Sequence, residues 1–166
     1  VRLAVSSSYW PMAWPTPVPA TLTVHGAESA LTLPVRPPRR EDAELRDLGS
    51  ARAAPPPPAT VIETANREWN VHFNLSTNEA TLTVVFDDPV LRLEGTGTTI
   101  ASEVNERYTV RNDDPTTVQA RVANRRRFGR PGWDITVITR TVLTATPAEF
   151  RVQSVVDAWE GDTRVL

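Results

Sequence analysis

The chain has 166 residues and a formal net charge of −2, and 40% of its residues are hydrophobic. This length is enough for one domain with a hydrophobic core, whereas the slightly acidic balance argues against general affinity for nucleic acid. Cysteine is absent, which excludes a disulfide framework and thiolate metal sites. No apolar run approaches the roughly 20 residues that a membrane-spanning helix needs, so we expect no membrane segment.

The first predicted element is a short strand that carries Leu3 and Val5, and a loop follows it. The loop contains three aromatic residues and three prolines, which are Tyr9, Trp10 and Trp14, and Pro11, Pro15 and Pro17. Because proline fixes φ and lacks an amide donor, this loop is stiff and does not belong in a sheet interior. The core face of a strand cannot account for all three aromatic rings. We therefore predict that Tyr9, Trp10 and Trp14 form a contact surface for a protein or for a sugar.

Alternating apolar residues return at Leu22 and Val24, and again from Leu31 to Val35. A turn at residues 26–28 separates them, which predicts a hairpin. Residues 36–59 break the alternation with many prolines, and only residues 41–48 favour one or two helical turns. This segment is therefore predicted to be a linker, a surface wrap or a crossover.

From residue 60 onward, period-two alternation predicts a series of longer strands. Their apolar positions fall within residues 69–75, 80–86, 100–110, 118–122, 133–137 and 150–158, and turn sequences separate them. We expect Trp69 and Phe73 to lie in the core. Long antiparallel strands joined by tight turns predict a meander that curls into a β-sandwich or a partial barrel. The predicted fold class is therefore all-β and antiparallel.

The residues offer little for catalysis. No serine lies in a Gly-x-Ser-x-Gly sequence, and both histidines, His25 and His72, fall on the polar faces of predicted strands. Two histidines without cysteine are too few for zinc. The acidic runs at 87–88 and 112–114 precede proline or lie in turns, where their side chains cap backbone amides. We therefore expect no catalytic residue, no metal site and no cofactor in this chain.

A basic cluster surrounds Phe128 on a predicted hairpin that ends at Gly132, and it consists of Arg125, Arg126, Arg127 and Arg130. Arginine beside an aromatic ring is suited to phosphates or single-stranded nucleic acid. It is equally suited to a solvated hairpin tip or to ion pairs with a partner domain. The acidic overall charge disfavours nucleic acid, and the role of residues 125–130 stays open between the other readings.

Five stretches of the sequence are similar to segments found in one enzyme family. They are RLAVSSSYWP at residues 2–11, WPTP at 14–17, LTLPVRPP at 31–38 with EDA at 41–43, RNDDP at 111–115 and AWEG at 158–161. In these stretches the chain resembles the C-terminal region of bacterial hydrolases of the cocaine esterase / X-Pro dipeptidyl-peptidase family. The resemblance extends over most of the chain, and its Ser-rich, Trp-Pro segment is the most specific part.

The resemblance implies a domain arrangement. Members of this family carry an α/β-hydrolase domain with a Ser-Asp-His triad, followed by a jelly-roll β-domain that packs on it and helps to shape the acyl side of the pocket. No triad motif matches any position of this chain, so no catalytic residue is carried over. Residues 1–35 would be the terminal strands of the jelly-roll-like sandwich and 36–59 the linker or crossover. Residues 60–166 would extend past the family's usual end, packed with 1–35 as one unit.

These observations lead to one expectation and one alternative. We expect a non-catalytic accessory β-domain of a serine hydrolase, whose loop at Tyr9, Trp10 and Trp14 contacts the α/β-hydrolase domain of the same polypeptide. The alternative is a free-standing β-sandwich module that binds carbohydrate or another protein. A second copy of the chain, in a homo-oligomer, is a further expected partner. We do not expect the chain to bind nucleic acid or membranes. Because the sequence shows no signal peptide, a cytoplasmic location is favoured.

Overall fold

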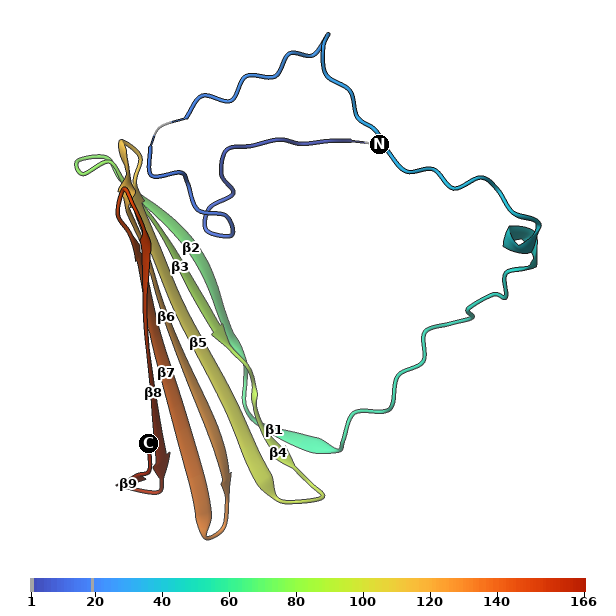
Figure 1. The fold of residues 1–166 in the computed structure, drawn as a ribbon. Helices are drawn as coiled ribbons and strands as arrows, with labels where there is room; N and C mark the ends of the chain where they lie inside the picture. The colour runs from blue at the N-terminus through green and yellow to red at the C-terminus, as the bar shows by residue number, and fades with distance from the viewer. Residues whose placement is uncertain (1, 19) are drawn as a thin grey trace. The chain divides into compact units, whose positions relative to one another are not determined.

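The computed structural model of the chain describes residues 2–18 and 20–166, and their regular structure is almost entirely β (Figure 1). The elements are η1 (Arg40–Glu44), β1 (Ala59–Glu63), β2 (Asn66–Asn74), β3 (Glu79–Asp87), β4 (Val90–Leu93), β5 (Thr98–Arg111), β6 (Asp114–Arg130), β7 (Trp133–Ala145), β8 (Phe150–Glu160) and β9 (Thr163–Arg164). All strand pairs are antiparallel. The prediction of an all-β antiparallel fold is confirmed.

The strands form one sheet in the order β1-β4-β5-β6-β7-β8-β9, and β3 joins it at β5 with β2 outside β3. Consecutive strands from β5 to β8 are neighbours, as the predicted meander requires, and tight turns connect them where turn residues occur. β6 is 17 residues long and pairs with both β5 and β7 over most of that length. The short strands β1, β4 and β9 were not anticipated, because two to five residues carry too little periodicity.

The register places alternate side chains on opposite faces of this sheet. One face, here called the apolar face, carries the odd positions of β2 and β7 and the even positions of β3, β5, β6 and β8. One row of cross-strand neighbours on this face illustrates its apolar composition, since it consists of Val71, Leu82, Tyr108, Ala120 and Leu143. The opposite face, here called the polar face, is rich in arginine, threonine and carboxylates.

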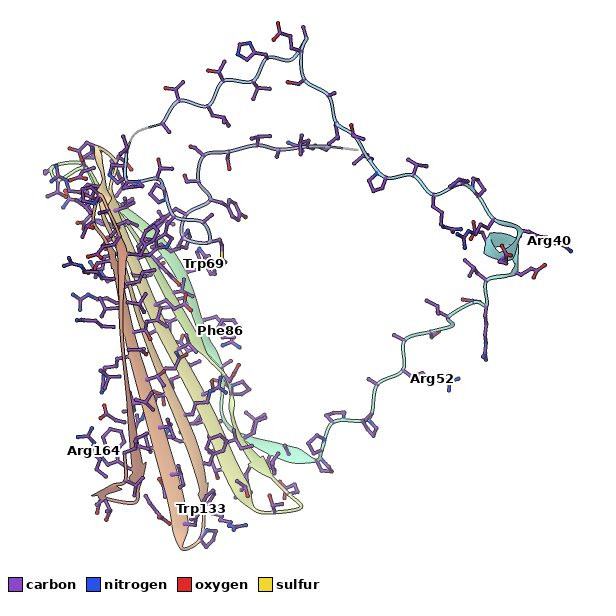
Figure 2. The ribbon with its side chains drawn as sticks, viewed as in Figure 1. Arg40, Arg52, Trp69, Phe86, Trp133 and Arg164 are labelled. Atoms are coloured by element: carbon purple, nitrogen blue, oxygen red, sulfur yellow. The ribbon has the colours of Figure 1, made fainter. Side chains whose placement is uncertain are left out.

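The core lies in the central strands. Leu82 and Val84 of β3 and Val118 and Ala120 of β6 are buried, whereas strand β2 at the edge is exposed along its whole length. The prediction that Trp69 and Phe73 belong to the core was wrong: Trp69 is 68% exposed and Phe73 is 41% exposed. Both rings do lie on the apolar face, but β2 has a neighbouring strand on one side only. Figure 2 labels Trp69 on β2 and Phe86 on the neighbouring strand β3.

The chain divides into two compact units, which are Val1–Thr21 together with Pro57–Leu166, and Leu22–Pro56. In the second unit, η1 is one short helical turn near the place where helical turns were expected. The Asp42 carboxylate accepts a hydrogen bond from Arg36 at 2.6 Å and from the Arg39 amide at 2.8 Å. These bonds, that from Arg36 first, hold the pKa of Asp42 below its usual value.

Residues 2–5, 21–25 and 31–35 differ from the prediction, because among the described residues they belong to no strand. The turn between the last two is present, with the Glu28 amide donating to the His25 carbonyl at 3.0 Å. The hairpin ladder does not follow it. A strand exists only where a neighbour accepts and donates its backbone hydrogen bonds, and these segments have no such neighbour within the described part of the chain.

Among the described residues, η1 is the only helix. No helix of these residues is long and apolar enough to cross a membrane.

Candidate functional site

The aromatic loop, here residues 6–17, is closed on itself by two backbone hydrogen bonds. The Tyr9 amide donates to the Ala13 carbonyl at 2.9 Å, and the Ala13 amide donates to the Tyr9 carbonyl at 2.7 Å. The peptide bond between Trp10 and Pro11, inside this closed turn, is cis. Proline supplies its own fixed φ at several positions around the turn. The loop is thus a defined knob rather than an open connector, as its sequence predicts.

Two tryptophans dock this loop on the apolar face of the sheet. The ring of Trp10 meets the ring of Tyr108 edge-on, with centroids 6.1 Å apart and planes at 83°. Trp14 meets Phe150 in the same way, at 5.7 Å and 82°. Edge-to-face pairs of this geometry are worth about 0.5–1.5 kcal/mol each beyond the area that they bury. Tyr108 and Phe150 therefore act as the receptor for the loop.

The three predicted contact residues consequently differ in their environments. Trp10 and Trp14 are half-buried on their own sheet, whereas Tyr9 is 72% exposed. Met12, at the tip of the turn, is also strongly exposed. Trp10 and Trp14 anchor the loop, and Tyr9 with Met12 forms its outward surface.

A cavity of about 330 Å³ lies beside Trp10, between the loop and one end of the sheet. Its lining includes Ser8, Pro15, Val110, Arg111 and Asn112. The indole Nε1 of Trp10 is buried and has no hydrogen-bond partner within the described residues. A buried donor of this kind is costly unless water or another group satisfies it.

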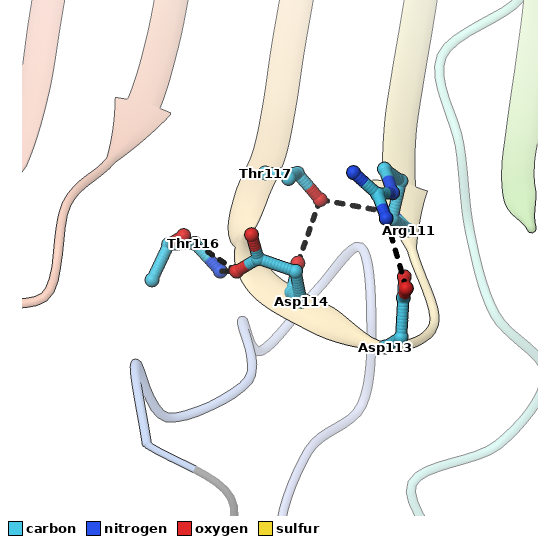
Figure 3. A network of polar contacts seen from close by, with 5 residues as sticks. All are labelled: Arg111, Asp113, Asp114, Thr116 and Thr117. Carbon is cyan, nitrogen blue, oxygen red and sulfur yellow. Dashed lines mark hydrogen bonds and ion pairs between the residues drawn. The ribbon is translucent and has the colours of Figure 1, made fainter. Parts of the chain in front are cut away.

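The turn between β5 and β6 borders this cavity, and its acidic residues have structural roles (Figure 3). Asp114 accepts hydrogen bonds from the Thr116 amide at 3.0 Å and from the Thr116 hydroxyl at 2.5 Å. These bonds, the hydroxyl first, lower the pKa of the Asp114 carboxyl. Arg111 pairs with Asp113 at 2.8 Å, and the Arg111 amide donates to Thr117 at 2.9 Å. The predicted capping of a backbone amide is therefore confirmed at Asp114, whereas Asp113 makes an ion pair with Arg111 instead.

Tyr108, whose ring contacts the loop, also makes a hydrogen bond within its own strand. Its hydroxyl donates to the Glu106 carboxylate at 2.8 Å. Burial, followed by the hydrogen bond to Glu106 and its negative charge, raises the pKa of Tyr108 to about 12. This tyrosine therefore remains neutral across the physiological range.

The polar face is organised by two carboxylates that each hold two arginines. Glu103 on β5 lies 3.1 Å from Arg127 and 3.8 Å from Arg125 on β6. Asp157 on β8 lies 2.8 Å from Arg140 on β7 and 2.5 Å from Arg164 on β9. Such partly exposed pairs are individually weak, and they join neighbouring strands across the polar face.

The cluster at residues 125–130 is divided by the pleat. Arg125 and Arg127 lie on the polar face with Glu103, whereas Arg126 and Arg130 lie on the face of Phe128. Arg130 is instead placed over the ring of Trp133, at 5.2 Å from its centroid. The four guanidinium groups therefore do not form one patch, and two of them make ion pairs inside this sheet.

Neither histidine joins a catalytic or metal-binding arrangement in the part of the chain that the structure describes. His72 lies on the polar face of β2, opposite Thr81. Its imidazole and that of His25 make no hydrogen bond or ion pair among residues 2–18 and 20–166. Within the same residues no three histidine or carboxylate side chains come close enough together to hold a metal ion.

Comparison of the chain with protein-family models, with curated proteins and with solved structures found no match.

Several residues of the site were missed by sequence reasoning. Tyr108 and Phe150 read as ordinary apolar-face residues, and only the fold reveals that they receive Trp10 and Trp14. Glu103 and Asp157 were likewise not singled out, since their two-arginine sites combine residues from different strands. Alternation does predict on which face each of these side chains lies, but it does not identify the neighbour.

Proposed function

We propose that this chain is a non-catalytic accessory β-domain of a serine hydrolase of the esterase or X-Pro dipeptidyl-peptidase type. Its role is to stabilise an α/β-hydrolase domain of the same polypeptide and to help shape the substrate site of that domain. The observation that carries the proposal is a set of strand-like apolar segments without strand partners. The resemblance of the segments at 2–11, 14–17 and 31–38 to this family supplies the identity of the partner.

The unpartnered segments argue for a further layer of protein. Residues 2–5, 22–24 and 31–35 have the alternation of half-buried strands, yet Leu3, Val5, Val24 and Val35 are exposed. Alternating apolar residues are selected where one face of a strand is buried. A neighbouring sheet that accepts these segments would satisfy both their backbone groups and their side chains.

Strand β2 at the edge and strand β8, which pairs with β9 only at residues 159–160, support the same conclusion. Val71 on β2 and Val152 on β8 lie on the apolar face and are 73% and 64% exposed. Trp69 and Phe150 add aromatic surface to the same face. Contiguous apolar surface of this kind is typical of an interface with another protein domain. The exposed pair Tyr9 and Met12 on the aromatic loop is the surface that we assign to the hydrolase contact.

A carbohydrate-binding module is the alternative, and the loop geometry favours it less. A sugar platform needs free aromatic faces in one plane. Trp10 and Trp14 are each engaged edge-to-face with a ring of the sheet, which leaves Tyr9 as the one largely exposed ring of the three. A broad glycan panel followed by tryptophan fluorescence tests this alternative directly.

The experiment that tests the proposal uses the protein as cells make it. An antibody raised against this chain captures the native polypeptide from source cells, and a fluorophosphonate probe labels any active serine hydrolase in the captured material. We expect a labelled band several times heavier than 18.3 kDa. The captured protein should hydrolyse a simple aryl ester or an X-Pro anilide.

A matched capture with the antibody pre-blocked by the purified chain controls for non-specific hydrolases. A native band at 18.3 kDa without a labelled polypeptide would contradict the proposal. In that case a fluorescence response to one member of the glycan panel would establish the binding-module alternative.

A further inference from the structure

An open hollow of about 330 Å³ on the polar face of the sheet is lined by arginines from three neighbouring strands. Arg107 comes from β5, Arg121 from β6 and Arg140 from β7. The hollow lies one same-face position along β6 from Arg125, because Ala123 belongs to its lining. It does not depend on the accessory role proposed above.

The strand register explains why three arginines line this hollow, with the Arg121 head group bonded to Gln119 and the Arg140 head group to Asp157. Arg107 lies directly opposite Arg121 across the β5–β6 ladder. In the next row on the same face, Ala123 of β6 lies between Asn105 of β5 and Arg140 of β7. The small methyl side chain of Ala123 leaves space that the long arginines surround, and this space is the hollow.

Three arginines and one carboxylate residue, Glu106, line the hollow, and the Glu106 carboxylate accepts the hydrogen bond of the Tyr108 hydroxyl on the apolar face. Arg125 and Arg127 share Glu103, and Arg140 is held by Asp157 at 2.8 Å. Arg121, by contrast, donates at 2.9 Å to the neutral side-chain oxygen of Gln119. The Arg107 guanidinium makes no hydrogen bond or ion pair to any residue of 2–18 or 20–166.

Like charges directly opposite each other on neighbouring strands are destabilising. The other cross-strand neighbour of Arg107 in this row, Thr83, is neutral. The row therefore contains no negative charge that would explain arginine at both position 107 and position 121. A ligand that brings negative charge between Arg107 and Arg121 would relieve this repulsion. The guanidinium fork matches the paired oxygens of phosphate or carboxylate groups.

We propose that this hollow is a binding site for a small oxyanion ligand that carries phosphate or carboxylate groups. Arg107 and Arg121 bind the anion from opposite strands. Arg140, oriented by Asp157, closes the third side, and Asn105 supplies a neutral polar neighbour. Because the three side chains are exposed, binding weakens as the ionic strength rises.

The test is an NMR titration of the chain at constant ionic strength, which follows the Nε–H signals of the arginines. Pyrophosphate is the phosphate probe, and citrate is the carboxylate probe. We expect saturable shifts at Arg107, Arg121 and Arg140, and the probe with the lower Kd identifies the preferred oxyanion class. Arg107→Gln and Arg121→Gln should each weaken binding by about tenfold or more, as expected for the loss of a charge-assisted bond. Arg151→Gln, on the same polar face, is the matched control and should leave the Kd unchanged.

Thermal unfolding gives a second, independent signature. Without ligand, Arg121→Gln should unfold at a temperature no lower than the wild type, because it removes a like-charge pair. The probe should raise the Tm of the wild type and of Arg151→Gln but not that of Arg121→Gln. The proposal is overturned if neither probe gives saturable shifts, or if Arg151→Gln weakens binding as much as Arg121→Gln. It is also overturned if Arg121→Gln lowers the Tm and keeps the ligand effect, which would make the arginine purely structural.

Discussion

Tyr108 connects the aromatic loop to the sheet through its ring and to Glu106 through its hydroxyl. Its neutral form is favoured in the folded protein, since burial and the nearby carboxylate both oppose the phenolate. The folded-state pKa of about 12 lies above the value of about 10 that a free tyrosine has. The stability that this group contributes is therefore complete below pH 10 and is lost as the pH rises toward 12.

An absorbance titration of the phenolate checks this shift. The chain has two tyrosines, so Tyr9→Phe leaves Tyr108 as the one reporter. We expect its midpoint near pH 12, and Glu106→Gln should lower the midpoint because the negative charge is removed. Circular dichroism at each pH shows whether the sheet is still folded. A Tyr108 midpoint near pH 10 in the folded protein would contradict a partly buried phenol that is bonded to Glu106.

The aromatic loop is an element whose position depends on two ring pairs, Trp10–Tyr108 and Trp14–Phe150. Residues 14 and 150 are far apart in sequence, so their contact is a property of the fold. The loop has few ladder hydrogen bonds of its own, apart from the pair between Tyr9 and Ala13. Its docking should therefore respond to the loss of either ring.

A double-mutant cycle measures that contact. Trp14→Ala, Phe150→Ala and the combined variant should show a coupling of about 0.5–1.5 kcal/mol in the free energy of unfolding. Trp14→Ala should also make the loop more sensitive to limited proteolysis, whereas the sheet should retain its circular dichroism spectrum. Additive effects of the two single substitutions would mean that the rings do not interact in solution.

Strands β2 and β3 show how one ladder can hold both a buried and an exposed apolar residue. Leu82 on β3 is 5% exposed, and its cross-strand neighbour Val71 on β2 is 73% exposed. The difference arises because β3 is flanked on both sides, by β2 and β5, whereas β2 is flanked by β3 alone. Burial here follows the position of the strand rather than the residue type.

Alanine substitutions at these two positions should therefore differ. Leu82→Ala should lower the free energy of unfolding by about 2–5 kcal/mol, because it removes buried methyl groups and leaves a cavity. Val71→Ala should change it by about 0.5 kcal/mol or less, as is usual for an exposed site. Urea unfolding at one low protein concentration compares them, and equal effects would mean that Val71 is covered in solution.

The molecule exposes large apolar side chains on the apolar face of the sheet and in residues 2–18 and 20–35. Exposed apolar strands at a sheet edge promote association with other chains. In the proposed hydrolase this surface would meet the rest of the polypeptide. In isolation it is available for contact between copies.

The isolated chain should consequently self-associate in a concentration-dependent manner. Sedimentation velocity at increasing concentration should show species heavier than 18.3 kDa. Val71→Lys and Val152→Lys, which charge the two exposed edge strands, should shift the distribution toward the monomer. The control variant is Arg52→Gln, which should leave the distribution unchanged. Val85→Lys is unsuitable as a control, because it alters the polar face near Arg107. A strictly monomeric wild type at all concentrations would contradict the exposed apolar face.

Local pattern by itself determined the long strands β2, β3, β5, β6, β7 and β8 and the turns that end them, but not the four-residue strand β4. Period-two alternation and turn residues act over a few neighbouring positions, so they are readable without knowing the fold. The same alternation assigned Trp69 and Phe73 to the apolar side correctly, but their exposure depends on β2 being an edge strand. It also predicted strands at 2–5, 21–25 and 31–35, where no ladder forms in the described chain.

Only the tertiary structure decided which distant residues meet. The receptor rings Tyr108 and Phe150, the carboxylates that each hold two arginines and the facing pair Arg107 and Arg121 all arise from strand register. Register is set by the combined pairing of long strands, and no short stretch of sequence encodes it alone. A strand pairs and is buried only where another segment lies beside it in the folded chain. Alternation in the sequence indicates only that the two faces of a strand differ.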